Sequence, residues 1–461
     1  MTIDVETQPS MRKRRGRERW SCCSAIEKVL RTFPTWTSSS PLTARLHHQP
    51  HQDQRTKMSE TYHAARDGSR ASISYGLPFT DAAKKHVEHT FNASRVYILA
   101  SASLATTTAE VQKLQDALGH RVAGVRIGMQ PHTLWSECLA ISANARAADA
   151  DLLLTLGGGS LIDAAKIVAL ALANNAQNST DLLALTTSGS PSSPVKEPTV
   201  PILAIPTTLS GGEYNDRAGG TNDATRQKYS FAGPIRGPAL VILDPRLTTA
   251  TPDKWWLSTG IRAVDHCVEA LCSLQGTRES DDDASEGLAK LIPGLLRCQR
   301  DRSDVEARLQ CQLAVVSAVK ATKGAPMGAS HGIGHQLGPL GVGHGETSCV
   351  LLPAVCRFNW DVNAERQRRV CGIIWGDGEV RDVLLGQGLS GESDLADLLD
   401  AYFRVLGMPR SLRAVGVGED RFAELARNSL TDRHLRTNPI PITEAEQVLE
   451  ILRIVEEFDR K

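Results

Sequence analysis

A buried strand that ends in consecutive glycines is the feature that most constrains this fold. Residues 151–156 form an apolar run, which is followed by three glycines at 157–159 and by Ser160. A helical pattern over 161–170 begins directly after the glycines. Glycines let a backbone approach a phosphate closely, and the first N–H groups of a helix point toward a bound anion. The segment therefore predicts an α/β protein that holds a phosphorylated cofactor, the alternative being a plain tight turn.

Apolar runs alternate with helical patterns between residue 95 and about residue 248. Strands are expected at 95–100, 121–126, 151–156, 200–205 and 239–243, with helices at 109–118 and 133–148. Such alternation predicts a mainly parallel sheet that is covered by helices on both faces.

Helical patterns dominate after Pro252. They span 259–274, 284–300, 304–321, 347–359, 395–405 and 443–458. We therefore expect two folded domains, an α/β dinucleotide-binding domain over 71–248 and an all-helical catalytic domain over 249–461. The cleft between two such domains is the natural ligand site.

The composition argues against two kinds of partner. The 461 residues include 52 Lys+Arg and 52 Asp+Glu, so no net charge favours nucleic acid or an anionic surface. No apolar run is long enough to span a bilayer. The ten cysteines form no CxxC pair, which argues against a thiolate zinc site and for reduced thiols. We expect a cytoplasmic protein that binds neither nucleic acid nor membrane.

The first seventy residues differ from the rest of the chain. Residues 11–20 form a basic run, and a Ser/Thr/Pro-rich stretch follows at 35–43. This composition suits a mitochondrial transit peptide, although Asp4 and Glu6 argue against one. We favour a poorly ordered leader over 1–70. An upstream extension, with Met58 as the working start, is a further alternative.

Candidate cofactor contacts follow the predicted strands. Besides the glycines Gly157, Gly158 and Gly159, they are Ser101, Ser160, Asp163, Thr207 and Thr208. Taken alone, the two threonines fit backbone capping in a turn equally well. No acidic residue follows the strand at 95–100 to grip a ribose hydroxyl or to repel a 2′-phosphate, so NAD(H) and NADP(H) both remain open.

Histidines gather in the second half of the chain. Arg262 and His266 are four residues apart, on one helix face, and so are His331 and His335. His344 follows in a glycine-rich turn. A lone helical histidine is more often structural, but three imidazoles with a carboxylate would suit Fe²⁺ or Zn²⁺.

Taken together, these motifs resemble the iron-containing alcohol dehydrogenase family, and within it the maleylacetate reductases. The resemblance covers roughly residues 70–455. It is carried by Gly157-Gly-Gly-Ser160 with Asp163 and Lys166, Pro206-Thr-Thr-Leu-Ser-Gly-Gly-Glu213, Arg262 with His266, His331-Gly-Ile-Gly-His335 with His344, and Asn438-Pro439. It implies a Rossmann-like α/β domain before an all-helical domain, as in the dehydroquinate synthase-like fold. It also implies NAD(P) on the glycine turn and a homodimer formed through the α/β domain.

The resemblance also bears on a metal. Metal-dependent members use an aspartate and three histidines, and the matching positions here are Arg262, His266, His331 and His344. An arginine cannot ligate a cation and repels it. Asp265 points about 100° away around the helix from His266. Maleylacetate reductases likewise lack the aspartate and are thought to work without metal, so we favour a metal-free site. The alternative is Fe²⁺ or Zn²⁺ held by His266, His331 and His344.

The implied reaction is hydride transfer from NAD(P)H to a carbonyl or enone. His266 and His331 are the first candidates as proton and hydrogen-bond donors, with His335 and His344 as orienting groups. Arg262 would pair with a substrate carboxylate, or else form an ion pair with Asp265 or Glu269. Arg217 and Lys323 are further cations for a dicarboxylate. The leading hypothesis is reduction of 2-maleylacetate to 3-oxoadipate in aromatic catabolism. The alternatives are an iron-type alcohol or aldehyde dehydrogenase and a non-catalytic cofactor-binding relative.

Overall fold

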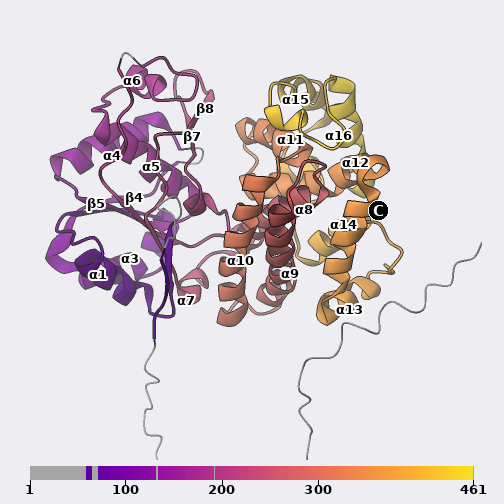
Figure 1. Ribbon diagram of the computed structural model, residues 1–461, viewed down its shortest axis with the longest axis horizontal. Helices are drawn as coiled ribbons and strands as arrows, with labels where there is room; N and C mark the ends of the chain where they lie inside the picture. The colour runs from indigo at the N-terminus through magenta and orange to yellow at the C-terminus, as the bar shows by residue number, and fades with distance from the viewer. Residues whose placement is uncertain (1–58, 65–70, 131–132, 192, 460–461) are drawn as a thin grey trace, which may run out of the picture. The chain divides into compact units, whose positions relative to one another are not determined.

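The computed structural model describes residues 59–64, 71–130, 133–191 and 193–459 (Figure 1). Most of the predicted leader, including Met58, lies outside these residues. Among the described residues, no helix is long and apolar enough to cross a bilayer.

A seven-stranded sheet organises the first half of the described chain. Its order is β1 (Thr61–His63), β2 (Ser72–Tyr75), β9 (Leu240–Leu243), β6 (Ile202–Pro206), β5 (Leu152–Gly157), β3 (Val96–Ala100) and β4 (Val122–Ile127). All neighbours pair in parallel except β1 and β2. The predicted parallel sheet is thus confirmed, with one antiparallel strand added at its edge by residues inside the segment 1–70.

Helices cover both faces of this sheet, as predicted (Figure 1). They are α1 (Phe79–His89), α2 (Ala102–Thr107), α3 (Glu110–Leu118), α4 (Trp135–Ala147), α5 (Gly159–Ala173), α6 (Ser179–Ala184) and α7 (Pro245–Thr248). Ile98 of β3 packs in a core with residues of α1 and α3, whereas its neighbour Leu99 packs with residues of α4 and α5. Side chains of a strand alternate between faces, so a continuously apolar strand requires a core on each side.

The strand order places a crevice beside the glycines. With β3 numbered 1 and β2 left out, the strands β4, β3, β5, β6 and β9 have the order 2-1-3-4-5, which reverses direction between β3 and β5. In open α/β sheets, ligands bind at the carboxyl ends of the strands where this reversal occurs. Ser101 follows β3 and Gly158 follows β5. The two segments therefore flank the position at which this fold binds ligands.

A short hairpin that the sequence patterns did not predict follows the sheet strand β6. It pairs β7 (Ala218–Thr221) with β8 (Lys228–Phe231) in antiparallel fashion. The ring of Tyr229 lies 5.0 Å from that of Trp135, which is fully buried, and this contact packs the hairpin against α4. A one-turn 3₁₀ helix, η2 (Gly212–Tyr214), precedes the hairpin.

The second half of the described chain is helical, as predicted. Its α-helices are α8 (Asp253–Cys272), α9 (Arg278–Arg300), α10 (Val305–Gly324), α11 (Ala329–Leu337), α12 (His344–Trp375), α13 (Gly378–Gly386), α14 (Leu395–Val405), α15 (Phe422–Ser429) and α16 (Ala445–Asp459). The 3₁₀ turns are η3 (Gly338–Leu340), η4 (Arg413–Val415), η5 (Glu419–Arg421) and η6 (Arg433–Leu435). The predicted boundary after residue 248 falls between α7 and α8.

Candidate active site

The glycine turn after β5 is shaped by backbone geometry that only glycine tolerates well. Gly157 has φ +156°, and a Cβ there would lie 2.5 Å from the side chain of Leu161. Gly158 is the N-cap of α5, and no side chain caps this helix. The first N–H groups of α5 are therefore left for another acceptor, which suits a phosphate.

The predicted cofactor contacts converge on this turn. A Cβ on Gly158 would lie 3.2 Å from the methyl group of Thr208, and one on Gly157 would lie 3.2 Å from Cβ of Ser101. Thr207 donates its backbone N–H to the carbonyl oxygen of Gly157 at 3.0 Å, and its side chain is buried. Thr207 thus supports the turn, whereas Ser101 and Thr208 line it. A bare backbone flanked by hydroxyls fits a dinucleotide diphosphate.

Asp163 and Lys166 hold this turn to the next loop. The ammonium of Lys166 is fully buried and donates to the carbonyl oxygens of Gly212 and Arg217, at 2.6 and 2.7 Å. Asp163 accepts the backbone N–H of Gly219 at 3.3 Å. The ammonium of Lys166 already donates to these carbonyl oxygens, so Lys166 is a structural cation. Oδ2 of Asp163, which is bonded to the hairpin, has a structural role as well.

Five imidazoles gather in the helical half, four of which were candidates from the sequence. The ring centroids of His266 and His331 are 4.9 Å apart, and those of His335 and His344 are 6.2 Å apart. His434, the fifth, lies 5.7 Å from His335 and 6.3 Å from His331. Residues from α8, α11, α12 and η6 therefore meet at one place.

His331 is held by a buried carboxylate. Its Nδ1 lies 2.7 Å from Oε2 of Glu269. Glu269 also accepts the backbone N–H groups of Gly328 and Ser330, at 3.0 and 2.9 Å. A carboxylate that already receives two N–H groups is best completed by a third donor, which places the proton of the neutral ring on Nδ1. Nε2 then carries the lone pair, and it has no partner among the described residues.

Arg262 belongs to the same buried group. It is 7% exposed, and its Nη1 contacts Asp265 at 3.4 Å and Ser348 at 3.0 Å. The ion pair considered for Arg262 therefore forms with Asp265 rather than with Glu269. No hydrogen-bond partner is described for its Nε or Nη2, so these N–H groups remain available to an anion.

Burial and the neighbouring charges both affect the protonation of Asp265, Glu269 and His331. Asp265 and Glu269 carry two negative charges against the single positive charge of Arg262. Burial raises the pKa of both carboxyl groups, and it lowers the pKa of His331, with the charge of Arg262 acting in the same direction on the histidine. One added proton on either carboxyl group would balance the charge of the group. His331 then stays neutral, and its free Nε2 accepts hydrogen bonds rather than donating them.

His266 is also held neutral. Burial, assisted by the charge of Arg262, lowers its pKa to about 3. Its Nδ1 is buried and has no partner among the described residues. An imidazole with such a low pKa carries almost no proton to give near neutral pH, which argues against its candidate role as the proton donor.

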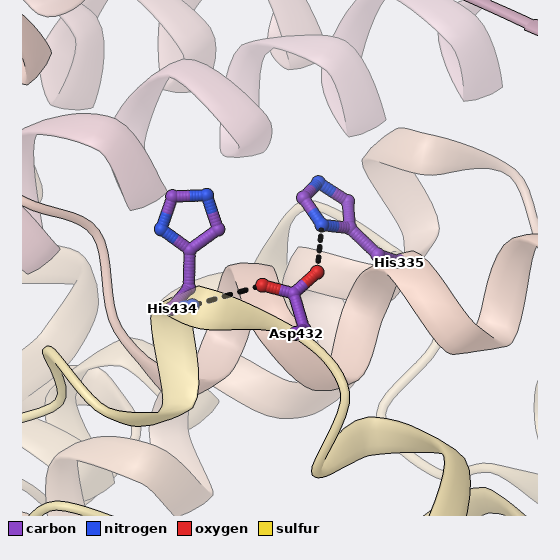
Figure 2. Close-up of side chains that lie close together, drawn as sticks. All are labelled: His335, Asp432 and His434. Atoms are coloured by element: carbon purple, nitrogen blue, oxygen red, sulfur yellow. Dashed lines mark hydrogen bonds and ion pairs between the residues drawn. The ribbon is translucent and has the colours of Figure 1, made fainter. Parts of the chain in front are cut away.

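His335 is paired with a carboxylate that the sequence motifs did not single out. Its Nδ1 lies 2.7 Å from Oδ2 of Asp432, and Oδ1 of Asp432 accepts the backbone N–H of His434 at 2.9 Å. Figure 2 shows the carboxylate between the two histidines, whose rings project in the same direction. The side chain of His335 is 34% exposed, so this pair is open to solvent in a way that the His331 pair is not.

Lys228 brings a cation from the α/β half to the histidines. Its Nζ lies 3.4 Å from Nε2 of His344, and its stem crosses Gly219, where a Cβ would lie 2.6 Å from Cε of the lysine. Lys228 is classed as exposed, but desolvation by the protein around its ammonium lowers its pKa. The negative charge of Asp163 opposes this shift, and the positive charge of Arg262 reinforces it. Lys228 thus lies within electrostatic reach of both the glycine-turn helix and the histidine group.

The donor set does not fit the metal site that the resemblance implies. Three ligand atoms within 4.8 Å of one another occur, among the described residues, in two groups: Asp265, Glu269 and His331, and His335, Asp432 and His434. His266, His331 and His344 form no such group. Arg262 moreover fixes a positive charge beside these imidazoles, which would repel a divalent cation.

The structure thus adds three residues to the predicted site and leaves two outside it. Arg217 and Lys323 are exposed, and no contact links their side chains to the described histidines. The added residues are Lys228, Asp432 and His434. Asn222-Asp223, between Gly-Gly-Thr and Tyr229-Ser-Phe231, is a turn signal that could have pointed to a hairpin containing Lys228. Asp432 and His434 have no comparable signal in the sequence. Asp432 is the N-cap of the one-turn helix η6, and such a cap does not by itself indicate a functional site.

Family models match almost the whole described chain. The model described as iron-containing alcohol dehydrogenase matches residues 79–245. The model described as the C-terminal part of the Fe-containing alcohol dehydrogenase family matches residues 256–455.

Individual relatives agree with the family models. The chain is 39% identical over 383 residues to dehydrogenase ALT3 of Alternaria alternata, covering 79% of this chain and 99% of that protein. It is 36% identical over 431 residues to dehydrogenase FUM7 of Gibberella moniliformis, covering 88% and 98%. The structure of a maleylacetate reductase from Agrobacterium tumefaciens superposes with a TM-score of 0.67 at 23% identity, covering 86% and 98%. At that identity the last match shows the shared fold.

Proposed function

Since the chain belongs to the iron-containing alcohol dehydrogenase family and is an oxidoreductase, we propose that it uses NAD(P)H to reduce a carbonyl or enone that carries a carboxylate. The observation that carries the proposal is the arrangement of two neighbouring regions. The uncapped glycine turn lies at the strand-order reversal, and Lys228 reaches from the same domain to the histidines of the helical half.

The cofactor is assigned to the glycine turn. Gly158 and Gly159 would receive the diphosphate, with Ser101 and Thr208 beside them. When bound there, a reduced nicotinamide supplies a hydride. The residues on this chain must then stabilise the negative charge that develops on the substrate oxygen, and they must provide a proton.

The fixed cations support a substrate with an anionic group. Arg262 keeps two nitrogens without a described partner, and Lys228 carries a second positive charge near His344. Charge-assisted hydrogen bonds to a carboxylate are worth about 1.5–3 kcal/mol each. Simple aldehydes lack this group and would form no ion pair with the two cations on binding, which favours a carboxylated substrate over an unsubstituted one.

The proposed reaction proceeds without a divalent metal at Arg262, His266, His331 and His344, because these residues do not offer a converging donor set. Arg262 takes over the electrostatic task and places a permanent positive charge where negative charge develops. Reduction of 2-maleylacetate is the first candidate reaction. Reduction of an aldehyde that bears a carboxylate is the second, since the related ALT3 and FUM7 proteins are named simply as dehydrogenases.

A substrate panel tests the proposal. Consumption of NADH and of NADPH would be followed with maleylacetate, with a carboxylated aldehyde and with the matching unsubstituted aldehyde, each before and after EDTA treatment. We expect turnover of a carboxylated substrate that EDTA leaves intact. Absence of binding by both reduced coenzymes would overturn the proposed oxidoreductase reaction. Loss of activity after EDTA, restored by Fe²⁺ or Zn²⁺, would overturn the metal-free mechanism.

A further inference from the structure

Both carboxylate oxygens of Asp432 take part in hydrogen bonds. Oδ2 holds Nδ1 of His335, and Oδ1 caps η6 by accepting the backbone N–H of His434 (Figure 2). The carboxylate cannot rotate away from His335 without giving up its cap. Such a fixed acceptor sets both the orientation of an imidazole ring and the nitrogen that carries its proton.

The consequence for His335 is a defined tautomer. Because Asp432 accepts at Nδ1, the second nitrogen, Nε2, is the one left to exchange a proton. At 34% exposure this side chain can be reprotonated by water, whereas His331 is 6% exposed and its Nε2 is buried. A proton donor must be reprotonated after every turnover, so access to water distinguishes His335 from His331 as a candidate donor.

We infer that Asp432 is the positioning residue that makes His335 the proton donor of the reduction, an inference that rests on the proposed function. In a carbonyl substrate the carbonyl carbon accepts a hydride from the reduced nicotinamide, and the π electrons of its C=O bond move to oxygen. In an enone the β-carbon accepts the hydride and the conjugated oxygen takes the charge, so the protonated product is an enol that tautomerises to the ketone. The N–H bond at Nε2 of the His335 imidazolium then breaks as the O–H bond of the product forms. His335 is left neutral, keeps its Nδ1–H on Asp432, and takes a new proton from water.

Two cations on other elements act on His335. Arg262 of α8 and Lys228 of β8 disfavour the imidazolium, and the rings of His331, His344 and His434 lie around it. Burial lowers the pKa of His335, and the hydrogen bond to Asp432 opposes that effect. Asp432 is thus the anion that keeps the imidazolium accessible between two cations. Removing its charge should lower the pKa of His335 further.

The kinetic test compares Asp432→Asn with Asp377→Asn. Asparagine is a good N-cap, so both variants keep their helix caps. Asp377 caps α13 by accepting the N–H of Val380, which makes it a matched control. We expect Asp432→Asn to lower kcat by about 10- to 100-fold, with the Kd for NADH unchanged, and Asp377→Asn to leave kcat unchanged.

The pH profile separates positioning from a structural role. A reduction that needs the imidazolium slows as pH rises through the pKa of His335. In Asp432→Asn this fall should move to lower pH, because the stabilising anion is gone. An unchanged kcat, or a lower kcat with an unmoved profile, would overturn the inference. If the wild-type protein does not turn over any carbonyl, the proposed function itself fails.

A readout without turnover is the tautomer of His335. In ¹⁵N-histidine-labelled protein, with the His335 signal assigned by His335→Gln, we expect the proton on Nδ1 in the wild type. In Asp432→Asn, the amide NH₂ replaces an acceptor and should move the proton to Nε2. The same tautomer in both proteins would overturn the positioning role. Stoichiometric Co²⁺ binding that Asp432→Asn abolishes would also overturn it, and would identify a metal site instead.

Discussion

His331 and His335 lie one helical turn apart on α11, and each has its Nδ1 2.7 Å from a carboxylate oxygen, yet their surroundings differ. Glu269 and His331 are buried beside Asp265 and Arg262. The side chain of His335 is 34% exposed, and that of Asp432 is 13% exposed. The comparison teaches that the carboxylate–imidazole distance alone does not assign a chemical role. The water access and the total charge around each pair decide which histidine can cycle a proton.

The largest expected effect is a difference in kcat between substitutions of His335 and His331. His335→Gln should lower kcat by about 10²–10⁴-fold, the range for loss of a general acid, with little change in the Kd for NADH. His331→Gln should cost far less in kcat, because a neutral ring with a free lone pair does not supply the proton. Steady-state kinetics with a carboxylated substrate would measure both, with the exposed His89→Gln as control. A larger loss for His331→Gln would reverse the assignment.

Arg262 belongs to the surroundings of the buried pair and should show its role in substrate binding. Arg262→Gln removes a charge-assisted hydrogen bond worth about 1.5–3 kcal/mol, so kcat/KM for a carboxylated aldehyde should fall by about 10- to 100-fold. The matching unsubstituted aldehyde should lose less. The ratio of the two kcat/KM values is the measurement, and an unchanged ratio would show that Arg262 does not select a carboxylate.

Disrupting the buried Glu269–His331 pair should mainly lower the free energy of unfolding. In Glu269→Gln an amide NH₂ replaces one acceptor oxygen, so at least one of the donors from Gly328, Ser330 and His331 loses its partner. Leaving a buried donor unpaired costs about 1–3 kcal/mol in the free energy of unfolding. Chemical denaturation would measure the loss against Asp432→Asn, which we expect to be smaller because its cap survives. Equal losses would contradict the difference in burial.

The same pair gives stability a pH dependence. Burial raises the folded-state pKa of Glu269 above its unfolded value, so the folded protein binds more protons above the unfolded pKa. The contribution to stability is complete below the unfolded pKa and is lost as pH rises through the folded one. Stability should therefore decline more steeply toward alkaline pH in the wild type than in Glu269→Gln.

Local patterns were sufficient to predict the framework. The apolar runs at 95–100 and 151–156 match β3 and β5 within a residue, and the glycines between β5 and α5 lie where the strand order reverses. These features are encoded by neighbours in sequence, through continuous apolar runs and the need for glycine backbone at Gly157. The helical half followed from the same kind of signal.

The chemistry of the site was less accessible to sequence. Asp432 meets His335 across 97 residues, and Lys228 meets His344 across 116 residues, so no local pattern reports either contact. The helical spacing of Arg262, Asp265 and Glu269 was visible, but which carboxylate pairs with the arginine depends on packing against Ser348 and His331. The structure therefore brings most of the histidine-site candidates together, while the roles proposed within that group needed the tertiary contacts.

Titration of the individual histidine rings tests the central claim most directly. In ¹³C-histidine-labelled protein, ring signals would be followed between about pH 5 and pH 8, where an ordinary imidazole titrates. We predict that His335 gains a proton at a higher pH than His331 and His266 do, because it alone is bonded to an accessible carboxylate. Protonation of His331 at a higher pH than His335 would contradict the account.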